Sequence, residues 1–152
     1  MYCSSKAQCE RLARELNCGH YYAEDVDRAE RLAEWAEGGG FIVATSALGT
    51  GVDFPGIVFI LHMGMPWSII DFAQESGRGG RAGEVVDSVI VIEEGEVDYR
   101  LSKDGESIDV AAMAQFIHAT GCRRGVMSWH LDGKRVECSD IEAVRCDWCG
   151  EG

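Results

Sequence analysis

The sequence predicts an α/β protein, in which a layered domain with a mostly parallel sheet is followed by a small helical tail. Helical and strand patterns alternate along most of the chain, as they do in layered α/β domains. Residues 57–61, IVFIL, form an unbroken apolar run, which is typical of a parallel strand covered on both faces. Beyond an acidic stretch, the pattern changes to two short helices and a group of cysteines.

The first helix is expected directly after Ser5, because Ser5 and Gln8 can form a capping box. Its apolar stripe follows the spacing i, i+3, i+4, i+7 and consists of Cys9, Leu12, Ala13 and Leu16. Gly19 is expected to end this helix, and a short strand follows around residues 20–23. A second helix is expected over residues 26–37, with an apolar stripe of Ala29, Leu32, Ala33 and Ala36, and it ends at a run of glycines.

Three strands and a helix are expected in the middle of the chain. Residues 41–44 form a buried strand, and residues 85–93 are the expected partner of the strand at 57–61. Between these last two strands, Ser68 can cap a helix that ends at Gln74. This order places the polar loops at one edge of the sheet, and ligands of open α/β sheets usually lie at the carboxyl ends of the strands.

The acidic stretch at residues 95–109 is expected to separate two domains, residues 1–108 and residues 109–152. The tail begins with a helix whose apolar face consists of Val110, Met113, Ala114 and Ile117. Gly121 is expected to end it, and residues 122–131 form a second helix.

The chain has 26 acidic and 14 basic residues, a net charge of −12, which argues against indiscriminate binding of nucleic acid. In the tail, however, four cations face only Asp132: Arg123, Arg124, Lys134 and Arg135. Since exposed charges are screened beyond ~10 Å, this patch could still meet a phosphate backbone weakly and salt-sensitively. No apolar run approaches the ~20 residues that span a bilayer, and seven cysteines without a secretion signal favour reduced thiols in a soluble intracellular protein.

A glycine-rich turn at residues 74–81, QESGRGGR, sets Arg78 and Arg81 three residues apart. Each guanidinium can grip a triphosphate oxygen through paired hydrogen bonds, and the glycines let the backbone approach a ligand closely. A second polar loop, residues 44–55, reads ATSALGTGVDFP and follows an expected strand.

These segments resemble RecQ-type DNA helicases of superfamily 2: residues 74–83 are similar to motif VI, residues 44–55 to motif V, and residues 1–6 to the end of motif IV. The residues around motif VI resemble most those of divergent RecQ-like helicases of fungi. The resemblance implies that residues 1–108 form the C-terminal RecA-like lobe of the motor, with a truncated amino-terminal strand. Such a strand leaves an edge open to aggregation or to completion by another segment.

The resemblance implies a role for each motif VI residue. Arg81 would act as the arginine finger on the γ-phosphate, Arg78 would assist at the lobe interface, and Gln74 would couple nucleotide to DNA. An arginine that stabilises a transferring phosphoryl group contributes roughly 10³ to 10⁵ in rate. In the alternative interpretation, the arginines are solvated or pair with Glu75 and Glu84.

Motifs V and IV imply nucleotide and DNA contacts. The residues implied on the nucleotide side are Gly49, Thr50, Gly51 and Asp53, and those implied on the DNA backbone are Ser4, Ser5, Thr45 and Ser46. Capping explains Ser5 equally well, and motif V could be only a tight connection. The chain has Phe54 where the family usually has lysine and Trp67 where it often has arginine, so two phosphate contacts are missing. Trp67 could stack on a base, which contributes ~1–3 kcal/mol, or cover apolar surface.

Four cysteines of the tail have the spacing C-x₁₅-C-x₇-C-x₂-C, and they are Cys122, Cys138, Cys146 and Cys149. Thiolates at such spacings suit a closed tetrahedral Zn²⁺ site, and the resembled family has a zinc-binding subdomain in this place. The alternative is a reactive dithiol at the carboxyl end. Cys3, Cys9 and Cys18 are interpreted as core or surface thiols, and His130 as a surface histidine rather than a ligand.

The 152 residues contain no phosphate loop of the pattern G-x-x-x-x-G-K-[ST] and no accompanying Mg²⁺-binding acid. We therefore expect no ATP turnover by the chain alone, and use of ATP with Mg²⁺ only when a first RecA-like lobe is supplied in cis or in trans. In that setting, the resemblance implies that the chain is half of an ATP-dependent 3′–5′ DNA helicase that acts on single-stranded or partly unwound DNA. The expected location is the nucleus if the protein is eukaryotic, with no membrane as a partner. The alternatives are a non-catalytic truncated fragment and a zinc-stabilised module that binds DNA or protein.

Overall fold

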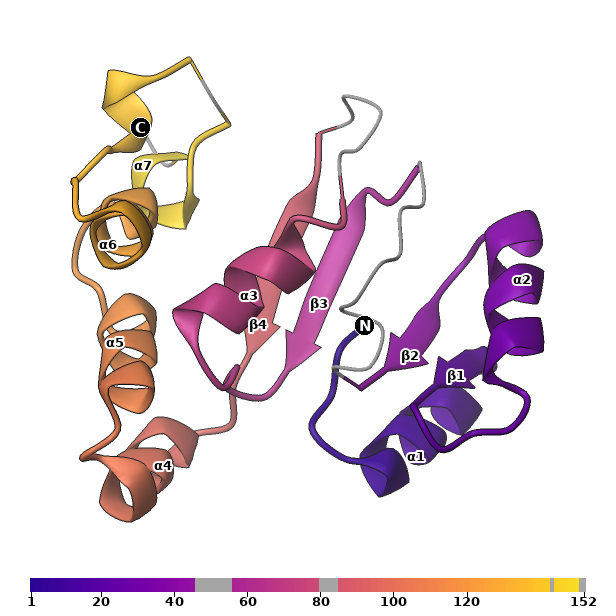
Figure 1. Cartoon of the computed structure of the whole chain (residues 1–152). Helices are drawn as coiled ribbons and strands as arrows, with labels where there is room; N and C mark the ends of the chain where they lie inside the picture. The colour runs from indigo at the N-terminus through magenta and orange to yellow at the C-terminus, as the bar shows by residue number, and fades with distance from the viewer. Residues whose placement is uncertain (46–55, 80–84, 143, 151–152) are drawn as a thin grey trace. The chain divides into compact units, whose positions relative to one another are not determined.

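The computed structural model describes residues 1–45, 56–79, 85–142 and 144–150 (Figure 1). Its contacts divide the chain into two compact units. The first, here called the sheet unit, consists of Met1–Met65 and Gln74–Glu93, and the second, the helical unit, of Pro66–Ala73 and Glu94–Gly152. The second unit thus begins its long segment after Glu93, earlier in the chain than the expected domain boundary at Ile108. The expected boundary stays a prediction.

The strands of the sheet unit all run parallel. Strand β1 (Gly19–Tyr21) pairs with β2 (Ile42–Ala44), and β3 (Phe59–Met63) pairs with β4 (Asp87–Val91). Tyr2 joins the two pairs, because it forms parallel bridges to Ala44 on one side and to His62 on the other. The mostly parallel sheet and the pairing of the 57–61 and 85–93 regions are therefore confirmed.

Helix α1 (Lys6–Leu16) begins at the expected cap. The Ser5 hydroxyl accepts a hydrogen bond from the Gln8 amide at 3.2 Å, whereas the Gln8 side chain accepts from the amide of Ser4 rather than of Ser5. The helix ends at Asn17, which adopts a left-handed conformation with φ of 52°. The prediction that Gly19 ends this helix was wrong, since Asn tolerates this conformation and Gly19 already belongs to β1.

Helix α2 (Arg28–Gly38) presents a different face from the predicted one. Ala29, Ala33 and Ala36 are exposed, so the alanine stripe was wrong. Leu32 and Trp35 instead pack against a core cluster that consists of Tyr2, Ile42, Ala44 and Ile60. The larger apolar side chains, not the more numerous small ones, decide which face turns inward, because they bury more area.

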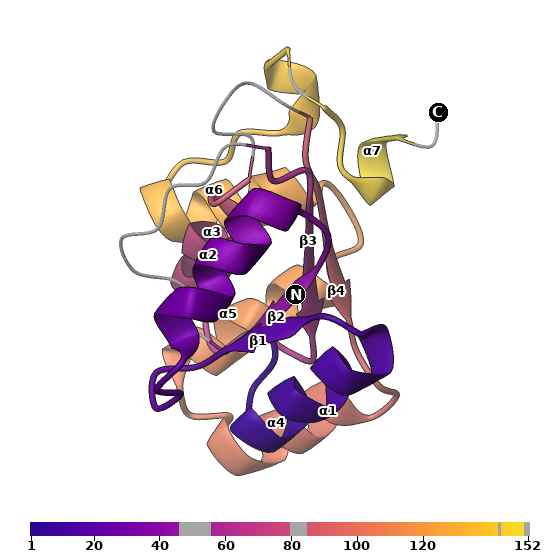
Figure 2. The same ribbon diagram turned by 90° about the vertical axis from the view of Figure 1, so that its right-hand side faces the viewer.

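Helices α1 and α2 lie on opposite faces of β2 (Figure 2). Val43 belongs to a second core cluster with the inward residues of α1, Cys9, Leu12 and Ala13, while its neighbours Ile42 and Ala44 belong to the α2 side. This alternation follows from the two-residue period of a strand. Cys3 and Cys9 are buried in this second cluster, which confirms their interpretation as core thiols.

The loop after β1 holds a buried carboxylate. Asp25 is 8% exposed, and its Oδ2 lies 3.0 Å from His20 Nε2 and 2.9 Å from Arg31 Nε. Its Oδ1 accepts a hydrogen bond from the Asp27 amide at 3.0 Å. This backbone hydrogen bond, followed by the charges of Arg31 and His20, lowers the pKa of Asp25.

The pair β3 and β4 is covered less than its apolar sequence predicted. Ile60 and His62 are buried, but Phe59 is 42% exposed and Val89 on β4 is 40% exposed. The prediction of a strand covered on both faces was therefore wrong. Glu75 of helix α3 (Ile69–Ser76) approaches His62 on the buried face.

The helical unit contains the beginning of α3 and the helices α4 (Glu96–Asp104), α5 (Ile108–Ile117), α6 (Arg123–Asp132) and α7 (Asp147–Gly150). Ser68 caps α3 as expected, since its hydroxyl accepts from the Asp71 amide at 3.0 Å. The two tail helices are confirmed as α5 and α6, although α5 ends at Ile117, before Gly121.

Helix α4 was not predicted, because the acidic stretch read as a boundary. Its signals are present: Glu96 and Asp98 lie in the first turn and Lys103 in the last, where each complements the helix dipole. Among the described residues, no helix combines the length and the apolar character needed to cross a membrane.

Candidate metal centre and arginine turn

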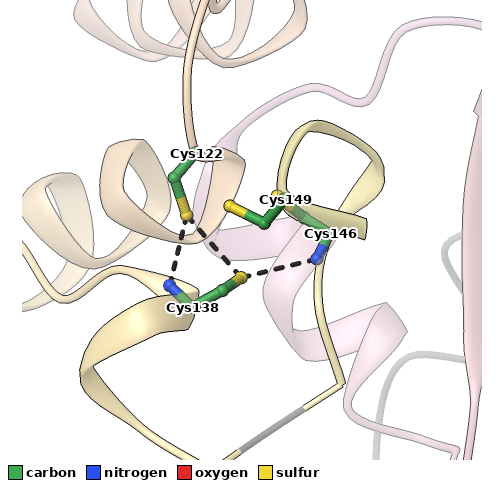
Figure 3. Close-up of side chains that lie close together, drawn as sticks. All are labelled: Cys122, Cys138, Cys146 and Cys149. Carbon is green, nitrogen blue, oxygen red and sulfur yellow. Dashed lines mark hydrogen bonds between the residues drawn. The ribbon is translucent and has the colours of Figure 1, made fainter. Parts of the chain in front are cut away.

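The four tail cysteines form one cluster (Figure 3). The sulfurs of Cys122, Cys138, Cys146 and Cys149 all lie within 4.8 Å of one another. Cys122 Sγ and Cys138 Sγ are 3.6 Å apart, too far for a disulfide. Four thiolates around one Zn²⁺, with Zn–S bonds of about 2.3 Å in tetrahedral geometry, would lie about 3.8 Å apart. The cluster therefore fits a metal ion such as zinc.

Short local elements hold these sulfurs. Cys122 precedes α6, Cys138 begins a short 3₁₀ turn that ends at Asp140, and Cys149 lies within α7. The Cys138 amide donates to Cys122 Sγ at 3.3 Å, and the Cys146 amide donates to Cys138 Sγ at 3.4 Å. Amide donors of this kind favour a charged sulfur. The backbone is thus arranged for thiolates.

The thiols of the cluster titrate differently. Burial acts to raise the pKa of Cys146, but hydrogen bonds, first from the backbone of Arg123, outweigh it and lower that pKa to about 6. Hydrogen bonding to Cys122, together with burial, raises the pKa of Cys149 to about 12. The sulfur of Cys146 thus favours the thiolate, which accepts hydrogen bonds, whereas Cys149 favours the protonated thiol. A bound metal ion would replace the protons of such thiols.

Arg123 ties the cluster to α5. Its Nε lies 2.7 and 2.9 Å from the two carboxylate oxygens of Asp147, next to Cys146. Its Nη1 donates to the carbonyls of Phe116 at 2.8 Å and Ile117 at 3.0 Å, which belong to the last turn of α5. One guanidinium therefore satisfies helix-end carbonyls and fixes the segment that carries two cysteines.

The segment before Cys138 is pinned to α6. The Ser128 hydroxyl accepts from the Val136 amide at 2.8 Å, and the Arg135 guanidinium lies over Gly125, where an added Cβ would meet it at 3.1 Å. Sequence reasoning missed Ser128 and Gly125, because neither is close in sequence to the segment it holds.

The tail arginines are largely occupied within the protein. Besides Arg123, Arg135 Nε pairs with Glu137 at 2.7 Å, and Arg124 donates to the Val144 carbonyl at 3.2 Å. These contacts weaken the hypothesis of a local phosphate-binding patch. His130 contacts Gln115 at 2.9 Å on the surface, and it does not belong to the cysteine cluster.

Ser4, Ser5 and Thr45 lie at the carboxyl edge of the sheet. The amide of Cys3 donates to the Ala44 carbonyl at 2.9 Å, so Ser4 and Thr45 follow neighbouring parallel segments. The structure therefore brings these three predicted DNA-contacting residues together. The hydroxyl of Ser5 already accepts from α1, as the capping interpretation requires.

The arginine turn lies at the other edge. Helix α3 connects two parallel strands and must run back along them, so Gln74 and Arg78 lie near the amino ends of β3 and β4. Gly79 confirms this placement, since a Cβ there would lie 2.7 Å from a Val86 methyl carbon. The motif VI turn thus does not lie at the carboxyl ends of the strands, where ligands of open sheets usually lie, because the crossover helix returns to the amino ends. Motif V lies mostly outside the described residues, so its predicted place at the same edge as motif VI stays a prediction. Gln74 is exposed and Arg78 is half-buried.

The remaining predicted site residues lie outside the described residues. They are Ser46, Gly49, Thr50, Gly51 and Asp53 of motif V, and Arg81 of motif VI. Their predicted roles stay predictions.

Trp67 is a member of a side-chain pair that the sequence did not indicate. Its ring is 57% exposed, and the Arg100 guanidinium carbon lies 4.3 Å from the ring centroid. This cation–π contact places a positive charge beside the one position where the chain lacks the arginine often found in the resembled family. One partner comes from the loop before α3 and the other from the unpredicted α4.

Residues 1–83 match the family model described as the helicase conserved C-terminal domain. The chain belongs to this family. Curated relatives of this helicase domain are RecQ-family ATP-dependent DNA helicases, which include an ATP-dependent DNA helicase Q1 of Caenorhabditis briggsae, 30% identical over 98% of this chain. A second is hus2/rqh1 of Schizosaccharomyces pombe, 39% identical over 55% of this chain. The chain covers 25% and 7% of these relatives, respectively.

Solved structures show the same fold for this helicase domain. The Escherichia coli DEAD-box protein SrmB aligns with a TM-score of 0.57 and 25% identity, over 69% of this chain and 66% of that one. The Mycobacterium smegmatis helicase Lhr, bound to ssDNA and AMP-PNP, has a TM-score of 0.57 and 19% identity, over 85% of this chain and 19% of that one. The predicted C-terminal RecA-like fold is confirmed. Animal and fungal relatives both match, so the similarity to fungal helicases in particular stays a prediction.

Proposed function

We propose that the chain is the C-terminal motor lobe of an ATP-dependent 3′–5′ DNA helicase of RecQ type. The observation that carries this proposal is the helicase family match over residues 1–83, which includes the arginine turn. The extension to RecQ activity rests on the named relatives, of which this chain spans about a quarter or less. A first RecA-like lobe, in cis or in trans, must supply the phosphate loop and the Mg²⁺-binding acid.

The two edges of the sheet unit suit the two tasks of a motor lobe. Arg78, which lies at the amino edge, and Arg81 of the same motif would neutralise charge that develops on the transferring phosphoryl group, with Gln74 assisting them. The backbone of motif V, including Gly49, Thr50, Gly51 and Asp53, would complete the nucleotide side. With nucleotide at one edge and DNA at the other, the sheet would connect the closing of the two lobes on ATP to a movement at the DNA.

At the carboxyl edge, small polar groups would hold the phosphate backbone. These groups are Ser4, Ser5 and Thr45, and Ser46 of motif V is proposed to have the same role. The Ser5 hydroxyl accepts from the Gln8 amide, but it keeps its own O–H to donate to a phosphate oxygen. Trp67 would stack on a base, with Arg100 as the nearby cation.

The cysteine cluster would hold one Zn²⁺ in a closed structural site. Zinc there supplies folding energy to the tail rather than chemistry, because four thiolates leave no open position. After Val126, the only apolar residue that is buried in the described part of the tail is Cys138, so a metal would hold together a segment with little core of its own.

The test is ATP hydrolysis stimulated by single-stranded DNA. The zinc-loaded chain would be measured alone and mixed with the first lobe of a related helicase. We expect hydrolysis only in the mixture, and a loss of about 10³-fold or more with Arg81→Ala. Arg14→Ala, which removes an exposed arginine of α1, is the matched control and should leave the rate unchanged.

A second candidate is a zinc-stabilised interaction module without catalysis. The net charge of −12 and the internal pairing of the tail arginines favour a partner other than DNA. A mixture that neither hydrolyses ATP nor binds single-stranded DNA, while the chain still carries zinc, would support this candidate instead.

A further inference from the structure

A polar pair is buried beneath the end of α3, outside any role assigned above. His62 Nε2 on β3 lies 3.6 Å from Glu75 Oε1 on α3, and the two side chains are 5% and 12% exposed. Among the described residues, only four polar or charged residues are buried, and this pair supplies two of them. Glu75 is the immediate neighbour of Gln74 in the arginine turn.

Tyr2 is the third member of this cluster. Its ring stacks on His62, with centroids 5.1 Å apart and an angle of 18° between the planes. Its backbone bridges β2 to β3, which fixes the ring at the centre of the sheet unit. Burial, followed by the charge of Glu75, raises the pKa of Tyr2 to about 12, while Arg78 acts in the opposite direction. The charges of Glu75 and Arg78 therefore act on the Tyr2 phenol in opposite directions.

A buried carboxylate is costly unless it is paired. The imidazole Nε2 and a carboxylate oxygen attract each other only when Nε2 carries a proton, since two acceptors would repel. An apolar pair of similar volume would hold the helix at least as firmly, because buried ion pairs contribute little net stability. The contact between Nε2 and Oε1 has a direction, however, because it exists only when Glu75 faces His62, and this sets the rotation of the end of the helix about its axis.

That rotation decides where the site residues point. Adjacent helical residues are turned by about 100°, so an inward Glu75 directs Gln74 away from the sheet, where it is exposed. The Arg78 amide donates to the Glu75 carbonyl at 3.3 Å, and the Gly79 amide donates to the Ser76 carbonyl at 3.4 Å. The turn that begins the arginine segment is therefore built directly on Glu75.

We propose that His62 and Glu75 are positioning residues for nucleotide hydrolysis: their buried pair, stacked against Tyr2, fixes the rotation of α3 and thereby the placement of Gln74 and Arg78. This rests on the proposed motor function. The pair touches no reacting atom, and it acts through the turn that it orients.

The kinetic test uses the two-lobe mixture described above, with Glu75→Gln and Glu75→Leu. We expect kcat to fall by about 10- to 100-fold, because small misplacements of catalytic groups cost that much. KM for ATP should stay within about twofold, since an orienting effect acts mainly on the transition state. Asp71→Asn, which changes an exposed acid on the same helix, is the matched control and should leave kcat unchanged.

A second measurement needs no activity. Amide hydrogen exchange of the zinc-loaded chain alone should show the Arg78 and Gly79 amides exchanging about tenfold faster in Glu75→Leu, with α1 and β2 unaffected. The double variant His62→Phe/Glu75→Leu guards against simple misfolding, because it removes both members of the pair together rather than leaving one of them without the other. It should melt close to the wild-type temperature and still show fast exchange and low kcat.

The outcomes separate the two proposals. Wild-type kcat and wild-type exchange in the double variant would overturn the positioning role. If the wild-type mixture hydrolyses no ATP, the motor function fails, and the exchange result alone then decides whether the pair orients the turn.

Discussion

Two of the buried polar centres in the described part of this protein are built in different ways. The cysteine cluster of the helical unit takes its four sulfurs from one stretch of chain, and local amide-to-sulfur hydrogen bonds hold them. The His62–Glu75 centre of the sheet unit joins a strand to the end of the following helix, and Tyr2 closes it from the start of the chain. The first has four sulfurs placed so that they could hold a metal ion, and the second depends on the packing of the whole unit.

Metal removal should distinguish the two centres most strongly, because only the cysteine cluster is expected to lose its fold. We expect one Zn²⁺ per chain, and we expect chelation to unfold the tail while the sheet unit stays folded. Structural zinc in small domains contributes about 10–16 kcal/mol of apparent binding free energy. Metal analysis, thiol titration and circular dichroism before and after chelation would measure this.

Cys146→Ser should reproduce the loss of zinc. Cys18→Ser, which changes a thiol outside the cluster, should retain the metal. A chain with well under one equivalent of zinc and four freely titratable cluster thiols would contradict the metal centre.

Overpacking at Gly79 should disturb the sheet unit and leave the tail unchanged. An alanine Cβ there would lie 2.7 Å from Val86 Cγ1 and 3.2 Å from Ile60 Cδ1. We expect Gly79→Ala to destabilise by about 1–3 kcal/mol, measured by urea unfolding of the zinc-loaded chain. Gly38→Ala has open space around it and should not destabilise. Equal effects from the two changes would argue against close packing of the arginine turn on β3 and β4.

Loss of Arg123 tests how far the metal centre depends on its surroundings. Arg123→Ala removes the contact of Nε with both carboxylate oxygens of Asp147 and the Nη1 donor to the end of α5. We expect zinc affinity to fall by about 10- to 100-fold, as for other groups that orient metal ligands. Competition with a chelator of known affinity would measure it. Arg123→Lys keeps the charge but not the paired geometry, so it should recover only part of the loss.

The smallest expected effect concerns Asp25, a third buried polar group, which lies in the loop between β1 and α2 and pairs with His20 and Arg31 of these elements. Its pKa is lowered by the Asp27 amide and by Arg31 and His20. A lowered pKa in the folded state means that its stabilising contribution is present above the ordinary pKa of about 3.9 and is lost as the pH falls below it. The difference in unfolding free energy between wild type and Asp25→Asn should therefore shrink from pH 7 to pH 3.5. A difference that grows towards acid pH would contradict this sign.

Sequence patterns predicted the elements of this protein better than their faces and directions. The cap at Ser5 and the partner of β3 were predictable from short-range rules. The inward face of α2 was not, because Leu32 and Trp35 are selected by the cluster they meet across the sheet. Helix α4 was hidden by its acidic composition, although its charges follow the helix dipole.

The sequence by itself determined the group of four cysteines and the arginine turn, because each depends on spacing within one segment. It also determined the parallel α/β class, because helix and strand patterns alternate along most of the chain. Only the tertiary structure decided that the arginine turn and the serines of motif IV lie at opposite edges of the sheet, since that depends on the direction in which α3 returns. Only the tertiary structure brought His62, Glu75 and Tyr2 together. No local pattern encodes that contact, because its partners come from separate elements that meet only in the folded sheet unit.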